Sequence, residues 1–324
     1  MSQRGLLPFR FFSAWFEPGL AQLAPQLNTQ PVRLALISEG WLTWPLYVAQ
    51  EKRLFEREGV NVDVTLTGSS VTQLEKLTKG DFDIGFQQSD HVVRGVENGS
   101  DLFIFMAQGR APDLSLVAAP GIRTFTDLKG KVIAVDGART GYALLLRKLL
   151  NGNGLKDGDF TFREIGGSRE RFEALKSGAV SASLLNAPFD RPLLAAGFCS
   201  LGAINELFPA YPGAIAAARR AWAQRNEKQL IAFIRAYDAG FAWLQDPDHK
   251  AEAIRMLPAR LGIGAEAAAE AYDRFAKWPR PLITAEELQK VIDVVWDAEG
   301  FKRPKGAPAK YLDLSYQQRA ARPR

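Results

Sequence analysis

The sequence predicts an α/β protein made of two doubly wound lobes. The first observation is the length of 324 residues, which exceeds what one hydrophobic core usually organises. The second is a repeated alternation of short apolar runs, typical of buried strands, with amphipathic helical segments. The third is a pair of Pro/Gly-rich stretches, residues 109–113 and 208–213, that separate the strand–helix series. We therefore expect a parallel sheet with helices on both faces in each lobe.

The first series begins at Val32–Ile37, an apolar run rich in branched residues that suits a buried parallel strand. Pro45 then stands at a tolerated first-turn position of a helix, which Gly59 ends. The same alternation continues up to the first Pro/Gly-rich stretch. It predicts strands Val62–Leu66, Phe82–Phe86 and Leu102–Ala107, and helices Val71–Lys79 and Asp90–Asn98.

The second series repeats this pattern between the two Pro/Gly-rich stretches. It predicts strands Leu114–Ala118, Val132–Val135, Phe160–Ile165 and Ala182–Leu185, with helices Thr126–Leu128, Gly141–Leu150 and Arg169–Lys176. Beyond Gly213 the pattern is helical, with an apolar stripe from Leu230 to Leu244 at a helical period. Further helices are predicted at Lys250–Leu261, Ala265–Ala276 and Ala285–Ala298.

The two stretches between the series predict that the chain crosses twice between lobes. We expect residues 31–112 and 211–300 in lobe one and residues 113–210 in lobe two. Residues 301–324 form a basic C-terminal tail with seven basic residues and one acidic residue. We interpret this tail as a solvated terminus, with an irregular strap as the alternative. Because it carries the positive charge, the rest of the chain is mildly acidic and no nucleic-acid partner is expected.

The residues available for catalysis are few. Cys199 is the single cysteine, and the two histidines, His91 and His249, have no metal-binding spacing. Neither a P-loop nor a Gly-x-Gly-x-x-Gly motif occurs, and no nucleophile–base pair is evident. We therefore expect a protein that binds a small molecule without catalysis, cofactor or metal. The opening Met1–Ala24 has a short apolar stretch interrupted by Pro8 and Arg10, so export stays open.

The strand-to-helix loops are the expected binding site, because ligands bind outside the carboxyl ends of strands in open parallel sheets. Five loops offer small or hydrogen-bonding side chains at helix starts, where free N–H groups favour an anion. The expected ligand-binding residues are Ser38, Trp41, Trp44, Ser69, Ser70, Gln87, Gln88, Ser89, Arg139, Thr140, Asn186 and Asp190. The alternative is that the Ser, Asn and Asp side chains only cap helices.

Arg139 and Thr140 precede the helix predicted from Gly141, so cation, hydroxyl and helix dipole would favour one anionic head group. Trp41 and Trp44 would flank a planar or apolar ligand body, unless they belong to the core. If Asp190 lies beside Arg139, the ligand is zwitterionic; if it caps or pairs with Arg191, it carries no such information. A small organic anion or heterocycle is therefore expected: a sulfonate, an aromatic carboxylate or a pyrimidine-like molecule.

Five sequence motifs match the pattern of one known family. Trp44–Phe55 (WPLYVAQEKRLF) is similar to its first-helix pattern x-Pro-x-Tyr-Val-Ala-x-x-x-Gly-x-Phe, and Gly80–Gly85 (GDFDIG) to its Gly-x-x-Asp-x-Gly strand. The remaining matches are Phe125–Lys131 (FTDLKGK), Leu175–Gly178 (LKSG) and Asn186–Phe189 (NAPF). With these motifs the chain resembles the nitrate/sulfonate/taurine and thiamine-pyrimidine-precursor group of type II periplasmic binding proteins. The resemblance extends over residues 31–298 and departs at Asn186, where many relatives have an acidic residue.

The resemblance implies the type II periplasmic-binding-protein fold, with a ligand held in the cleft between two lobes. It also implies a periplasmic, monomeric substrate-binding subunit that closes on its ligand and engages the membrane permease of an ABC-type importer. Two alternatives on the same fold stay open. One is a cytoplasmic ligand-sensing module, and the other is an enzyme like the aromatic sulfinate desulfinases. The latter place a nucleophilic cysteine after the first strand, where this chain has Ser38–Gly40.

Overall fold

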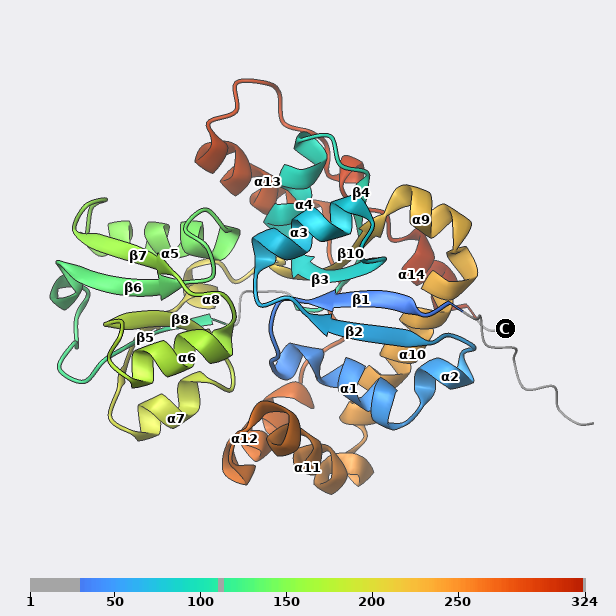
Figure 1. Cartoon of the computed structure of the whole chain (residues 1–324), viewed down its shortest axis with the longest axis horizontal. Helices are drawn as coiled ribbons and strands as arrows, with labels where there is room; N and C mark the ends of the chain where they lie inside the picture. The colour runs from blue at the N-terminus through green and yellow to red at the C-terminus, as the bar shows by residue number, and fades with distance from the viewer. Residues whose placement is uncertain (1–29, 110–113, 323–324) are drawn as a thin grey trace, which may run out of the picture.

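A computed structural model of the chain describes residues 30–109 and 114–322, which form two α/β lobes (Figure 1). Each lobe is built on a five-stranded sheet. The segment considered for export and most of the first predicted crossing lie outside the described residues. In the part of the chain that is described, no helix combines the length and apolar character needed to span a membrane.

Lobe one contains the sheet with strand order β2-β1-β3-β10-β4. Its strands are β1 (Val32–Leu36), β2 (Val62–Leu66), β3 (Ile84–Gln88), β4 (Leu102–Ala107) and β10 (Ala214–Arg219). Helices α3 (Ser70–Lys79), α4 (Ser89–Glu97) and α13 (Ala285–Glu299) lie on one side in Figure 1, and α1 (Trp44–Glu51), α2 (Leu54–Arg57) and α10 (Glu227–Gln245) on the other. The shorter α9 (Arg220–Arg225) and α14 (Ser315–Ala320) complete this lobe.

Lobe two contains the sheet with strand order β7-β6-β8-β5-β9. Its strands are β5 (Leu114–Ala118), β6 (Lys131–Val135), β7 (Phe160–Glu164), β8 (Ala182–Asn186) and β9 (Cys199–Ala203). Its helices are α5 (Gly141–Gly152), α6 (Ser168–Lys176), α7 (Asp190–Ala195) and α8 (Ile204–Leu207). The sheet membership of the strands is compatible with the predicted lobe limits, although the limits themselves stay a prediction.

Each sheet contains one strand that runs opposite to its neighbours. β10 is antiparallel to β3 and β4, and β5 is antiparallel to β8 and β9. Both strands directly follow a crossing between the lobes. The chain therefore enters each sheet at the edge formed by the carboxyl ends of the parallel strands, and the entering strand runs in the opposite direction to them. The expectation of wholly parallel sheets is therefore wrong for these two strands. The helical pattern assumed beyond Gly213 is also wrong at β10, whose alanine-rich sequence has low strand propensity and is fixed by its neighbours.

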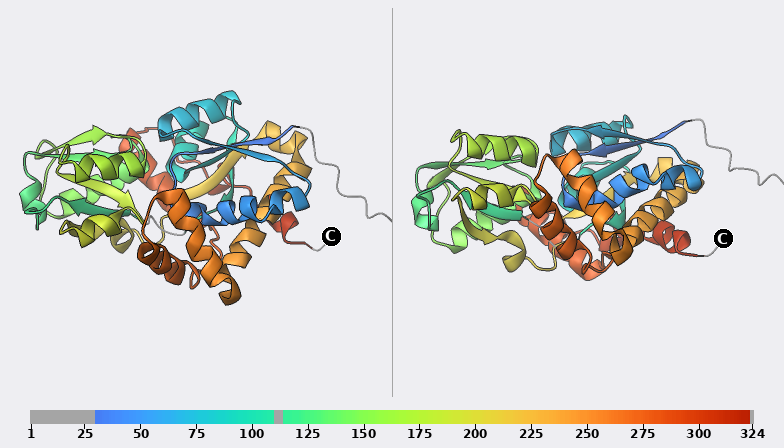
Figure 2. Two further views of the ribbon diagram at one scale, coloured as in Figure 1. Left: turned by 60° about the horizontal axis from the view of Figure 1, so that its bottom comes forward. Right: turned by 90° about the horizontal axis from the view of Figure 1, so that it is seen from below.

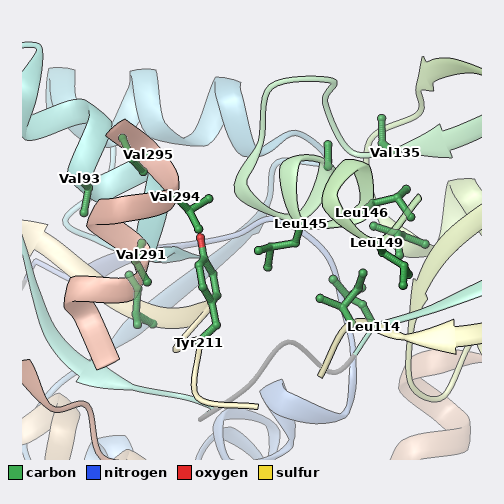
Figure 3. Packing of buried hydrophobic residues seen from close by; sticks show 14 of the residues in the cluster. Val93, Leu114, Val135, Leu145, Leu146, Leu149, Tyr211, Val291, Val294 and Val295 are labelled. Atoms are coloured by element: carbon green, nitrogen blue, oxygen red, sulfur yellow. The ribbon is translucent and has the colours of Figure 1, made fainter. Parts of the chain in front are cut away.

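Helices α11 (Lys250–Leu261) and α12 (Ala265–Phe275) come forward in Figure 2 and lie where the two lobes meet. Together with the start of α1 they enclose an apolar cluster that includes Phe241, Leu257 and Phe275. A larger cluster is continuous between the lobes. Figure 3 shows Tyr211, in the second crossing, between Val294 of α13 and Leu145 of α5. Helix α13 thus packs against both lobes beside the crossing segments.

The C-terminal tail packs against lobe one, so its interpretation as a solvated terminus is wrong. Leu312 pairs with Ile104 at the edge of β4, and Tyr311 is fully buried. The Glu97 carboxylate accepts hydrogen bonds from Lys310 Nζ and the Tyr311 hydroxyl, both at 2.6 Å. Arg303 Nε also lies 2.9 Å from the same carboxylate. The basic residues of the tail therefore hold a strap in place, which was the alternative interpretation.

Candidate functional site

A cavity of about 120 Å³ lies between the lobes. Its walls come from the carboxyl ends of β1, β3 and β6, from β8, and from the first residues of α6, as expected for an open α/β sheet. The lining residues are Leu36, Ile37, Ser38, Glu39, Gly40, Leu42, Thr43, Phe86, Gln87, Gln88, Gln108, Leu114, Asp136, Tyr142, Ser168, Arg171, Asn186 and Ala214. An engineered apolar cavity of roughly 150 Å³ accepts benzene, so this space suits a molecule of about one ring.

Four of the predicted binding residues line this cavity: Ser38, Gln87, Gln88 and Asn186. The first three come from lobe one and Asn186 from lobe two. Their assignment to a ligand stays a prediction, but the structure brings them together at one site. They occupy the ends of β1, β3 and β8, which is the feature that the sequence pattern identified.

Four other predicted residues, Ser69, Ser70, Ser89 and Thr140, do not line the cavity. The Ser69 hydroxyl accepts a hydrogen bond from the Thr72 N–H and caps α3, and the Thr140 hydroxyl does the same for Ala143 in α5. Ser70 is buried and donates to Asp136 Oδ2 at 3.2 Å, which joins the lobes. Ser89 is fully buried at the start of α4. The helix-capping alternative therefore describes Ser69 and Thr140.

Trp41 and Trp44 are core residues, so the prediction that they flank a ligand is not supported. Trp44 is fully buried among the side chains of α1, α10 and α12. Trp41 is 3% exposed and stacks on Trp278 with ring centroids 4.5 Å apart. The sequence could not separate these roles, because the aromatic residues that pack on both rings, in and directly after α12, lie more than two hundred residues further along the chain.

Arg139 does not face the cavity, so the structure contradicts its predicted role with an anionic head group. Its side chain is 79% exposed, and Nη2 lies 2.7 Å from Glu299 Oε2 of α13. The start of α5 is occupied instead by Asp90, whose Oδ2 accepts a hydrogen bond from the Gly141 N–H at 2.7 Å. Asp190 is buried at the start of α7 and is not part of the lining, while Arg191 lies 3.4 Å from Glu270.

Asp136 is the main site residue that the sequence analysis did not select. It follows β6, and its carboxylate accepts hydrogen bonds from Gln88 Nε2 at 2.9 Å and Thr140 Oγ1 at 2.7 Å. Ser70 supplies a third donor. Two of these three donors belong to the other lobe. Direct bonds therefore join the lobes across the cavity, and the conformation described is a closed one. The position of Asp136 directly after a strand was the available sequence signal.

Arg171 is a second lining residue that was missed. It lies inside α6 and is 5% exposed, and each of its nitrogens has a protein acceptor: Leu184 O, Gly166 O and the Ser168 hydroxyl. Burial lowers the pKa of the Arg171 guanidinium, and the Asp136 and Glu170 carboxylates act in the opposite direction. The Ser168 hydroxyl in turn donates to Asn186 Oδ1. Nothing in the local sequence distinguishes Arg171 from a surface arginine of a helix.

A second group of contacts closes the cleft at its rim. Arg169 of α6 reaches lobe one, where Nη2 lies 3.2 Å from Glu39 Oε2. The same nitrogen donates to the carbonyls of Arg260 and Leu261, at 3.3 and 3.1 Å. These carbonyls end α11, where a cation is favoured by the helix dipole. Arg169 is thus held by an ion pair and by a helix terminus of the opposite lobe.

Two mixed sheets joined by two crossings, with a cavity between the lobes, define the type II periplasmic-binding-protein class. The chain belongs to the NMT1/THI5-like family, which it matches over residues 43–250. A binding protein of Brucella abortus, so described by its name, is 26% identical over 214 residues, or 63% of this chain. The match spans 65% of the length of that relative.

Solved structures share the fold at low sequence identity. The periplasmic nitrate-binding protein NrtA from Synechocystis is 15% identical, with a TM-score of 0.75 over 92% of this chain and 89% of that one. The alkanesulfonate-binding protein SsuA from Xanthomonas axonopodis, bound to MOPS, is 18% identical, with a TM-score of 0.71 over 88% and 100%. DszB, in complex with biphenyl-2-sulfinic acid, is 13% identical, with a TM-score of 0.63 over 89% and 99%. At these identities the similarity establishes the fold alone.

Proposed function

We propose that this chain is the substrate-binding subunit of an ABC-type importer, which captures a small organic molecule between its lobes. The observation that carries the proposal is the cavity closed by side chains of both lobes, with Asp136 bonded to Ser70 and Gln88 across it. A ligand that fills this space stabilises the closed form by its differential affinity. The names of the related binding proteins agree with this role. A periplasmic location and a membrane permease as partner are parts of the same proposal.

Binding without turnover is the second part of the proposal. Among the described residues, the cavity lining contains neither cysteine nor histidine. Ser38 stands at the cavity after the first strand, and no side-chain base is hydrogen-bonded to it among the described contacts. Cys199 lies on β9, an edge strand of lobe two. A nucleophile with an activating base is therefore not assembled there, which disfavours the desulfinase-like alternative.

The experiment is an affinity-selection screen of the purified protein against a mixed library of anions, aromatic acids, amides and heterocycles. Compounds retained by the protein are identified by mass spectrometry after denaturation. The proposal expects at least one retained compound, recovered chemically unchanged, which also raises the melting temperature. A ligand at one hundred times its Kd adds about 2.7 kcal/mol of stability. Enzyme-dependent conversion of a retained compound would contradict binding without turnover, and retention of none would contradict capture.

A further inference from the structure

Gly40 of lobe one and Asn186 of lobe two meet across the cleft. Gly40 follows β1 and is buried, Asn186 ends β8, and both residues line the cavity. A Cβ atom added at position 40 would overlap the amide nitrogen of Asn186. The side chain of Asn186 therefore occupies the space that any larger residue at position 40 would need.

The backbone conformation at position 40 does not itself require glycine. The φ and ψ angles of Gly40 are both 175°, which is extended backbone open to every residue. Glycine is also used where another part of the protein approaches the backbone closely. The close approach of Asn186 from the opposite lobe is therefore the physical reason for a glycine at this position.

The Asn186 side chain is held in place by its own lobe. Its amide oxygen accepts a hydrogen bond from the Ser168 hydroxyl, and its amide nitrogen donates to Ala187 O at 3.3 Å. The Ser168 hydroxyl in turn accepts a hydrogen bond from Arg171 Nη2 at 2.9 Å. Rotating Asn186 away from Gly40 would break both of its hydrogen bonds.

The loop that carries Gly40 is fixed as well. The Gly40 carbonyl accepts the Thr43 N–H at 3.1 Å, which closes a short turn. The next residue, Trp41, is 3% exposed and stacks on Trp278. Because both sides of the contact are fixed, a side chain at position 40 would push the two lobes apart.

Two further close approaches between the lobes lie beside this contact. A Cβ atom added at Gly167 would lie 3.2 Å from the Cβ atom of Ser38, and one added at Gly166 would overlap the Gly68 carbonyl. Gly166 and Gly167 are not among the described residues of the cavity lining. Gly40 differs from them because it also borders the space that a ligand fills.

We propose that Gly40 determines ligand size by setting how far the lobes close. With glycine at this position the lobes meet around a space of about 120 Å³, which suits one ring. A methyl group there would stop closure earlier, weaken the contacts with a one-ring ligand and leave room for a larger one. One carbon atom more or less in a pocket changes discrimination by about 10- to 200-fold. This inference rests on the proposed function, because it names the size class accepted by the same cavity.

A disulfide trap tests closure without any ligand. Ser38→Cys and Gly167→Cys, in a Cys199→Ser background, place two thiols on opposite sides of the cleft. The 3.2 Å between these Cβ positions is close to the separation of about 3.5–4.5 Å in a disulfide, so the bond forms when the lobes close. Oxidised glutathione supplies the oxidant, and non-reducing electrophoresis of the full-length protein follows the rate. Gly40→Ala, added to this trap, should slow crosslinking about tenfold, which corresponds to about 1.4 kcal/mol.

Two further variants assign the effect to the contact. Gly152→Ala is the matched control, because no heavy atom lies within 4 Å of its added Cβ. Asn186→Ala, combined with Gly40→Ala, removes the blocking amide and should restore the crosslinking rate. An unchanged rate in Gly40→Ala, an equal loss in Gly152→Ala or no rescue in the double variant would overturn the inference. Unfolding of Gly40→Ala would overturn it as well, because lobes that separate relieve the overlap without unfolding.

The affinity-selection screen then tests ligand size in wild type and Gly40→Ala. It is extended with pairs of one-ring and fused two-ring compounds: benzoate and 2-naphthoate, benzamide and 2-naphthamide, and pyrimidine and quinazoline. Wild type is expected to favour one-ring compounds, and Gly40→Ala should shift retention towards larger ones. The absence of such a shift would overturn the role of Gly40 in specificity. Retention of no compound by either protein would contradict capture itself, and the ligand-free trap distinguishes that failure from a failure of the steric contact.

Discussion

The Asp90 carboxylate of lobe one caps a helix of lobe two, because its Oδ2 atom accepts a hydrogen bond from the Gly141 N–H at 2.7 Å. Asp90 is fully buried and lies 3.0 Å from Arg94 Nη1. The positive end of the α5 dipole therefore faces an anion that belongs to the protein itself. Arg94 also contacts Glu299 at 2.9 Å, which links α4, α5 and α13 beside the crossing segments.

Gly141→Ala tests this contact, because a Cβ at position 141 would overlap the Asp90 carboxylate. We expect the free energy of unfolding to fall by about 1–3 kcal/mol, as for other overpacked sites. Gly152→Ala, at the other end of α5, is the control, since no heavy atom lies within 4 Å of its added Cβ. That variant should be neutral or more stable by about 0.5–1 kcal/mol. Urea denaturation measures both, and equal losses would show that α5 does not depend on the capping contact.

Arg139→Ala is expected to have little effect. The Arg139 side chain is 79% exposed, and Glu299 keeps its ion pair with Arg94 in the variant, so stability should change by less than about 1 kcal/mol. The increase in melting temperature produced by a bound ligand should match that of the wild type. A thermal-shift assay on both proteins measures this directly. Loss of the ligand-induced increase in the variant would return Arg139 to the binding site.

Arg169→Ala should accelerate ligand release, because it removes the ion pair with Glu39 and the contacts to the last carbonyls of α11. We expect the dissociation rate to rise about tenfold, with a smaller change in the association rate. Arg163→Ala is the matched control: Arg163 is exposed on lobe two and bonds to Ala179 O of the same lobe. Stopped-flow displacement of a ligand found in the screen measures the rates. Equal rates in the two variants would show that Arg169 does not hold the cleft closed.

The ion-paired contacts between Glu97 and the strap should weaken in acid. Burial alone would raise the pKa of Glu97, but hydrogen bonds from Lys310, Tyr311 and Arg303 hold it below the usual value of 4.5. A lowered pKa means that this contribution to stability is present above pH 4.5 and is lost as the pH falls through the folded-state value.

Glu97→Gln should therefore lower the melting temperature near neutral pH, and its effect should shrink as the pH falls from 4.5 through the lowered pKa of Glu97. Melting curves of wild type and variant, from neutral pH down to the lowest pH at which both proteins stay folded, measure the difference. A difference that stays constant over this range would contradict the ion-paired role of Glu97. Glu75→Gln is a suitable control, because Glu75 pairs only with Lys79 on the exposed surface of α3.

Much of the fold follows from local features of the sequence. The apolar run Val32–Leu36 and the helix that starts near Pro45 are found where the pattern predicts them, because a buried parallel strand needs continuous apolar residues and a proline favours a helix start. Polar residues after strands, such as Ser38, Gln88 and Asn186, lie at the cavity for the same reason: carboxyl ends of parallel strands meet at one edge. Strand β10 was not predictable in this way. Alanine has a low intrinsic strand propensity, and this segment becomes a strand because it is hydrogen-bonded to β3 on one side and β4 on the other.

The roles of individual side chains were decided by tertiary structure. Trp41 and Arg139 follow strands at positions where ligand contacts were expected. In the structure Trp41 stacks on Trp278, and Arg139 forms an ion pair with Glu299. Both partners come from distant parts of the chain. Asp136 lies in the cavity wall because the closed lobes bring it to Ser70 and Gln88. Gln108 lies there because its N–H bonds to Ala214 at the start of β10. The sequence by itself therefore determined most of the strands and helices, though not β10, and which edge of each sheet carries the site. Which side chains face the cavity depended on packing between the lobes, because long-range contacts bury or neutralise groups that local patterns leave equivalent.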